Sequence, residues 1–114
     1  MKAGRDRIDL LRGTLDLLIL RTLLLGPAHG HQIAKHIQRS TDDVLQVEHG
    51  SLYPALHRME RKGWLAWKWE SGEGQRELKY CRLTAQGKKQ LLIEESKWEQ
   101  VVSAIARVPA QAES

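Results

Sequence analysis

The sequence has a single cysteine, Cys81, and lacks any long uncharged apolar run, and each absence excludes a class of protein. One thiol cannot form an internal disulfide, and the N-terminus lacks the small-residue cleavage site of a secretory signal, so a cytoplasmic location is expected. The most apolar stretch, residues 10–25, carries three charges in 16 residues, which is too short and too charged to cross a membrane. A core helix is expected there, and no membrane partner.

The sequence also lacks the motifs that accompany common enzymatic chemistry. It contains no glycine-rich phosphate loop, no His-Glu-x-x-His, no Cys-x-x-Cys and no nucleophile elbow. His29, His31 and His36 do not share one helical face, and no carboxylate or cysteine is spaced to complete a metal site with them. No enzymatic activity, metal or cofactor is therefore expected.

Charge is distributed unevenly along the 114 residues, of which 41% are hydrophobic and 28% charged, as in one globular domain. The net charge is +4, and residues 49–90 hold nine basic and four acidic side chains, whereas residues 91–114 hold two and four. The basic segment indicates an anionic partner, and the acidic and apolar end indicates a protein partner. Simple solvation of exposed faces is the alternative explanation for the basic segment.

Apolar spacing predicts two helices in the first part of the chain. Residues 10–25 form the first helix, which ends at Gly26-Pro27 and is apolar around most of its circumference. A second copy of the chain, or another long helix, should therefore lie against it. Residues 31–39 form a short second helix, and residues 40–48 form the connecting loop.

A third helix and a hairpin follow. Ser51 is the expected N-cap of this helix, because Pro54 is tolerated without distortion only in a first turn, and Gly63 ends the helix. Residues 64–70 alternate between two faces, and residues 76–84 supply a returning strand after a glycine-containing turn.

A final helix of about six turns is predicted over residues 85–107, at the rise of 1.5 Å per residue. The predicted fold class is mainly α with a small β-hairpin, a winged helix-turn-helix with a C-terminal dimerisation helix. The DNA-binding domain covers residues 8–84, the dimerisation helix covers 85–108, and the ends at 1–7 and 109–114 are expected to be flexible.

Several stretches of the chain narrow this class further. The sequence resembles the PadR family of bacterial transcription regulators in its short form, over about residues 8–107. His31 and Cys81 depart from the family pattern, in which aromatic residues are usual at both positions. The matching stretches are Arg12-Gly13-Thr14-Leu15, His29-Gly30-His31, Gly50-Ser51-Leu52-Tyr53-Pro54-Ala55-Leu56, Gly63-Trp64-Leu65 and Lys79-Tyr80-Cys81-Arg82-Leu83-Thr84 with Gly87.

The resemblance implies a cytoplasmic homodimer that binds a pseudo-palindromic operator in double-stranded DNA and usually represses transcription. It also implies release of DNA when a small aromatic or lipophilic effector binds. Two alternative functions remain open from the residues. One is a winged-helix module that binds proteins and never DNA, and the other is a metal or redox sensor that uses Cys81 and the histidines.

The outer face of the third helix is expected to contact DNA. Tyr53, His57 and Arg61 fall on one line at a spacing of four, opposite the apolar stripe of the helix. Hydroxyl groups suit phosphates and base edges, and arginine can bind guanine with two hydrogen bonds. Glycines near the hairpin tip allow its backbone to approach a phosphate or the minor groove. With the family resemblance, the predicted DNA contacts are Lys35, Ser51, Tyr53, Pro54, His57, Arg58, Arg61, Arg76 and Lys79.

The last helix is expected to form the dimer. A heptad count places Leu91, Trp98, Val101 and Ile105 at a and d positions, which form the seam between paired helices. A tryptophan at an a position would approach its mate across the twofold axis, where it either packs the interface or lines a flat cavity for an effector. The predicted dimer interface consists of Leu15, Ile19, Leu91, Trp98, Val101 and Ile105.

Overall fold

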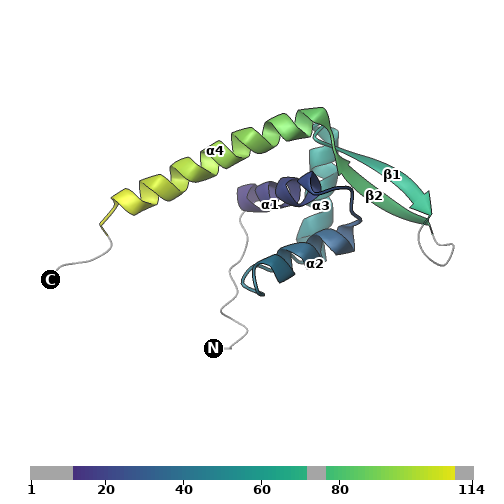
Figure 1. The fold of residues 1–114 in the computed structure, drawn as a ribbon, viewed down its shortest axis with the longest axis horizontal. Helices are drawn as coiled ribbons and strands as arrows, with labels where there is room; N and C mark the ends of the chain where they lie inside the picture. The colour runs from purple at the N-terminus through teal and green to yellow at the C-terminus, as the bar shows by residue number, and fades with distance from the viewer. Residues whose placement is uncertain (1–11, 72–76, 110–114) are drawn as a thin grey trace.

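The structure of the protein is a computed structural model, in which residues 12–71 and 77–109 are described. Figure 1 shows a central helix with one helix below it, a long helix above it and a hairpin at one side. The mainly helical fold with one two-stranded antiparallel sheet confirms the predicted class. The ends predicted to be flexible lie outside the described residues, except for Pro109. In order, the elements are α1 (Arg12–Leu24), α2 (Gly30–Ser40), α3 (His49–Arg61), β1 (Leu65–Ser71), β2 (Glu77–Leu83) and α4 (Ala85–Arg107).

Helix α1 forms the centre of the core, because the other elements of its own chain surround it. Helices α2, α3 and α4 and strand β2 all pack on it, and α4 lies above it in Figure 1. Of the two coverings predicted for α1, the long helix is therefore the one found. Leu15 and Ile19 are 5% and 0% exposed within a single chain, which corrects their assignment to the dimer interface.

Helix α3 begins at His49, three residues earlier than an N-cap at Ser51 would allow. The backbone N–H groups of Ser51 and Leu52 both donate to the carbonyl of Glu48 at 2.9 Å, so the first turn starts at His49 and Glu48 is the N-cap residue. The prediction for Ser51 was wrong because Pro54 is accommodated in the second turn, where its missing N–H removes one backbone hydrogen bond.

The C-terminal end of α3 confirms the predicted role of Gly63. Gly63 adopts a positive φ of 83°, its N–H donates to the carbonyl of Glu60 at 2.9 Å, and the N–H of Trp64 donates to the carbonyl of Met59 at 3.1 Å. This pair of hydrogen bonds is the Schellman motif, which needs a left-handed residue and favours glycine. The motif turns the chain directly from α3 into β1.

The hairpin packs one face on the core. Its antiparallel register pairs Leu65 with Leu83, Trp67 with Cys81 and Trp69 with Lys79. Leu65, Cys81 and Leu83 are buried. The backbone of Cys81 also exchanges two hydrogen bonds with Ala28, at 2.8 and 3.0 Å, which ties β2 to the segment that precedes α2.

Helix α4 has the predicted bounds and is anchored at its first turn. The hydroxyl of Thr84 donates to the carbonyl of Gly63 at 2.7 Å and accepts from the N–H of Gly87 at 2.9 Å. A Cβ at Gly87 would overlap the carbonyl oxygen of Trp64, so a glycine is required for this close approach. The long helix is thereby joined to the base of the hairpin.

The two halves of α4 differ in their surroundings. Leu91, in the first half, is 4% exposed in the core of its own chain, which corrects its assignment to the dimer interface. Every residue over 96–109 is exposed, and Figure 1 shows this half extending past α1. Within residues 12–71 and 77–109, no helix has the length and apolar character that crossing a membrane requires.

Candidate nucleic-acid interface

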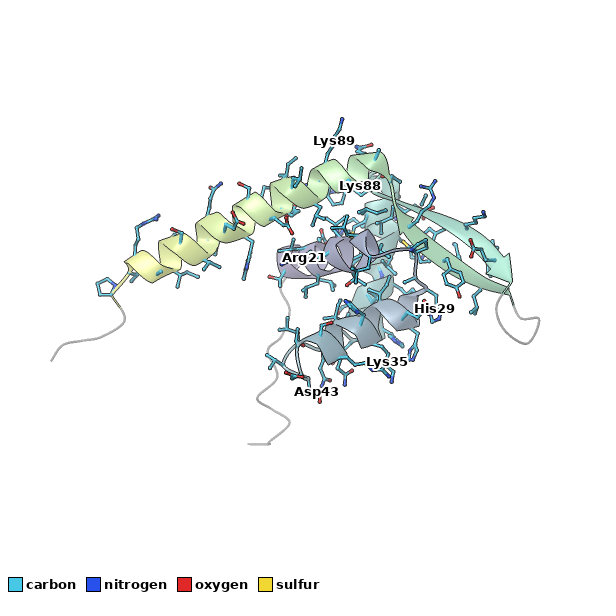
Figure 2. All side chains as sticks on the ribbon, in the orientation of Figure 1. Arg21, His29, Lys35, Asp43, Lys88 and Lys89 are labelled. Atoms are coloured by element: carbon cyan, nitrogen blue, oxygen red, sulfur yellow. The ribbon has the colours of Figure 1, made fainter. Side chains whose placement is uncertain are left out.

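The N-terminal ends of α2 and α3 meet the hairpin around one groove, which we call the reading groove. It has a volume of about 450 Å³ and opens to solvent. Figure 2 places His29 at the start of α2, on the side that faces the hairpin. The reading groove is lined by His29, Gly30, His31, Tyr53, His57, Trp67, Leu78 and Lys79.

Helix α3 separates its two faces cleanly. Leu52, Leu56 and Met59 are fully buried, so the opposite side of the helix is directed to solvent. This open side displays hydroxyl, imidazole and guanidinium groups, which can donate hydrogen bonds to phosphates and base edges. The predicted contacts that the structure places on it are Ser51, Tyr53, Pro54, His57 and Arg61.

Tyr53 is held between the two helices of the motif. Its side chain is 39% exposed, and a Cβ at Gly30 would overlap its ring and hydroxyl. Gly30 therefore lets the tyrosine lie across the first turn of α2 with one edge in solvent. A fixed aromatic hydroxyl at this position suits a phosphate contact.

Arg58 does not belong to the open face. Its guanidinium donates two hydrogen bonds to the carboxylate of Asp16 on α1, at 2.8 and 3.0 Å, and the two side chains are only 14% and 11% exposed. This bidentate geometry fixes α3 on α1. The prediction that Arg58 contacts DNA is therefore corrected, because its charge is already used inside the protein.

The described part of the hairpin contributes Lys79 to the groove. The Nζ atom of Lys79 lies 4.8 Å from the ring centroid of Trp67, and the ring of Trp67 lies 6.4 Å from that of His57. The cation–π contact holds the ammonium group at the rim of the groove. Lys35 is exposed but lines a separate hollow between the end of α1 and α2, and Arg76 lies outside the described residues.

A row of aromatic rings borders the groove, and sequence reasoning missed it. The ring centroid of His29 lies 5.6 Å from that of Tyr80 on β2 and 6.4 Å from that of His31. The ring centroid of His31 lies 5.9 Å from that of His49 on α3. His49 in turn lies 5.8 Å from Tyr53. The signal available in the sequence was that these histidines occupy the first turns of two helices that a helix-turn-helix brings together.

His29 also has a local structural role. Its Nδ1 accepts a hydrogen bond from the N–H of Gln32 at 3.3 Å, and the Gln32 side chain accepts from the N–H of His29 at 3.0 Å. This reciprocal arrangement is a capping box at the start of α2. Burial, and then the charge of His31, lower the pKa of His29, which favours the neutral ring that the cap requires.

Cys81 is placed in the interior instead of at the groove. It is fully buried, and burial, assisted by the charge of Glu60 and opposed by Lys79, raises its pKa to about 12. A thiol with so high a pKa is a poor redox sensor. Within the part of the chain that the structure describes, no group of three or more His, Cys, Asp or Glu side chains could hold a metal ion.

A second hollow lies between α1 and the middle of α4, and we call it the α1–α4 pocket. It has a volume of about 400 Å³, and Trp98 at its edge is 44% exposed. The pocket is lined by Gly13, Thr14, Leu17, Glu94, Lys97, Trp98 and Val101.

Two helices joined by a short loop, followed by a hairpin beside the second helix, define a winged helix-turn-helix. Comparison with known proteins identifies the family. The profile of the transcriptional regulator PadR-like family matches residues 19–92. The chain therefore belongs to the PadR family of transcriptional regulators, and this membership implies binding to DNA.

Individual relatives and solved structures are also similar to this chain. An uncharacterised protein from Lysinibacillus sphaericus is 32% identical over 100 residues, which cover 87% of this chain and 91% of that protein. The structure of a transcriptional regulator from Clostridium thermocellum has a TM-score of 0.79 and 30% identity, covering 85% of this chain and 94% of the other. A PadR family transcriptional regulator from Eggerthella lenta has a TM-score of 0.74 and 32% identity, covering 89% and 86%. The family and these two structures are transcriptional regulators, a class distinct from enzymes.

Proposed function

We propose that this chain is a homodimeric repressor that binds a pseudo-palindromic operator and releases it when a small aromatic or lipophilic molecule binds. The observation that carries the proposal is the reading groove, where an open recognition face on α3 adjoins a lysine held at the hairpin. Because the proposed operator lies in chromosomal DNA, the proposal includes a cytoplasmic location.

In this proposal α3 enters the major groove and the hairpin follows the backbone. The exposed side of α3 supplies His57 and Arg61 for base edges, while Ser51, Tyr53 and the adjoining Pro54 lie close to the sugar-phosphate chain. On the hairpin, Lys79 supplies a phosphate contact. Lys35 and Arg76 are retained as proposed contacts to the DNA backbone.

The proposed dimer forms through the outer half of α4. Trp98, Val101 and Ile105 are 44%, 47% and 66% exposed along one seam of the outer half of α4. A strip of this kind is normally buried by a partner, and a second copy presents the same strip. Two subunits would then read an inverted repeat with half-site centres about one DNA turn apart, or a small multiple of it.

The proposed effector site is the α1–α4 pocket. Its volume of about 400 Å³ is suitable for a small planar molecule, and Trp98 supplies an aromatic wall. Because the same residue lies on the proposed dimer seam, a bound molecule would alter how the two subunits pack. Quenching of tryptophan fluorescence by planar aromatic compounds, lost in Trp98→Phe, would locate the ligand there.

Selection of genomic fragments by the purified protein tests the function directly. We expect a symmetrical motif protected from cleavage in a footprint, and Tyr53→Ala or Lys79→Ala should weaken binding about tenfold without changing the dimer mass. Lys89→Ala is the matched control, because Lys89 lies on the side of α4 that points away from α2 (Figure 2).

Two results would overturn the proposal. The first is recovery of no symmetrical motif together with a protein partner in pull-down experiments, which would favour the winged-helix interaction module. The second is unaltered binding by both variants, which would reject the assigned groove. The metal or redox sensor has less support, because the thiol of Cys81 is buried away from the histidines that line the groove.

A further inference from the structure

Four of the five histidines in the sequence gather around the reading groove, at His29, His31, His49 and His57. We propose that DNA binding is coupled to proton uptake by His31 and His49, so that affinity for DNA rises as the pH falls. This inference rests on the proposed DNA-binding function and adds regulation of the same site by protons.

His31 and His49 are placed where DNA would change their charge. Both side chains are exposed, and each lies in the first turn of its helix, α2 or α3. Their ring centroids are 5.9 Å apart, and that of His49 is 5.8 Å from Tyr53 on the recognition face. A phosphate that contacts the Tyr53 edge would therefore lie near both imidazoles.

Each ring stands at a helix N-terminus, where the helix dipole favours an anion such as a phosphate. The phosphates of DNA would stabilise the imidazolium form of both rings, because each negative charge attracts it and accepts hydrogen bonds from it.

Charged and titratable groups of β2 and α3 surround the row. The ammonium group of Lys79 on β2 and the imidazole of His57 on α3 line the same groove, while Tyr80 of β2 and Tyr53 of α3 close the two ends of the row. Glu48 precedes His49 and is exposed, and the described residues include no ion pair between the two.

His29 keeps the row in place. Its neutral Nδ1 caps α2 by accepting from Gln32, and burial lowers its pKa. The neutral form of His29 is therefore favoured, and its ring stacks on that of His31 with the centroids 6.4 Å apart and a 15° interplanar angle. The cap and the proton acceptors are separate residues.

Fluorescence anisotropy with a labelled mixed-sequence duplex of about 30 base pairs tests the coupling at constant ionic strength. For the unaltered protein, we expect binding at least about tenfold tighter near pH 6 than near pH 8. His31→Gln with His49→Gln should reduce this ratio to about twofold, the remainder belonging to His57. His36→Gln is the matched control, because His36 contacts Ser40 on α2 and does not line the reading groove.

Calorimetry in two buffers of different ionisation enthalpy measures the proton uptake itself. The unaltered protein should take up protons on binding, and the double variant should take up fewer. Equal affinity at both pH values, or a pH dependence that survives in the double variant, would overturn the inference while DNA binding stands. Absence of binding at either pH would overturn both the inference and the proposed function. Circular dichroism of each variant at both pH values confirms that the fold is retained.

Discussion

Helix α3 and the outer half of α4 both present a surface to solvent, yet the two surfaces are chemically opposite. Helix α3 buries its entire apolar stripe in its own chain and leaves hydroxyl, imidazole and guanidinium groups in solvent. The outer half of α4 leaves Trp98, Val101 and Ile105 in solvent instead. The first surface is suited to an anion, whereas an exposed apolar strip such as the second is normally buried by a partner protein.

The largest expected effect concerns the ion pair behind α3. Arg58→Met should lower the free energy of unfolding by about 3 kcal/mol, because it leaves the largely buried carboxylate of Asp16 without its guanidinium. Urea unfolding measures this loss, and Asp16→Leu combined with Arg58→Met should recover at least half of it. An effect confined to DNA binding, with stability unchanged, would return Arg58 to the recognition face.

The next effect tests the apolar surface of α4. Val101→Asp with Ile105→Asp should produce monomers in sedimentation velocity and weaken operator binding about 100-fold, because two linked DNA-binding domains bind far more tightly than one. The free energy of unfolding of each subunit's DNA-binding domain should change little. Gln100→Asp with Ser103→Asp adds the same charge on the polar side of α4 and should leave the dimer intact. A dimer that persists in the first variant would contradict the assigned seam.

A smaller effect distinguishes charge at the groove from charge elsewhere. Lys79→Gln should reduce the slope of log affinity against log salt by about 0.9, the value for one lost phosphate contact. Lys89→Gln removes an equal charge on the other side of the molecule and should leave the slope unchanged. Equal slopes for the two variants would show that only net charge matters.

The smallest effect concerns Cys81, in the interior behind both surfaces. Because burial raises its pKa to about 12, the thiol should resist alkylation near pH 8 until the protein unfolds. Its raised pKa also means that the folded state holds this proton more tightly, so stability should fall as the pH rises from about 9 toward 12. Rapid labelling of the native protein, read by mass spectrometry, would contradict this burial.

Local signals in the sequence were sufficient for most of the fold. Gly63 ends α3 as predicted, because the capping chemistry at this position depends only on neighbouring residues. Pro54 led to a wrong prediction for the start of α3, since a proline in the second turn of a helix is disfavoured but not forbidden. Each strand boundary differed from its prediction by one residue, which is the ordinary variation at element ends.

Long-range partners could not be inferred from periodicity. The pattern identified Leu15, Ile19 and Leu91 as residues to be buried, but it could not distinguish burial in the same chain from burial against a second one. Arg58 likewise was read as exposed, because its partner Asp16 lies 42 residues earlier in the chain. The histidine row was missed for the same reason, since its members come from separate elements.

A small tilt of α4 at its first turn, where Thr84 and Gly87 join it to the hairpin, would move its far end by a larger distance. The 23 residues of α4 extend about 34 Å, so a tilt of about 5° would displace the far end by about 3 Å. In a paired assembly, that displacement would change the distance between the two α3 helices relative to the pitch of duplex DNA. In the proposed dimer, the spacing of the two α3 helices would therefore depend on the contact where the Gly87 backbone meets the carbonyl of Trp64.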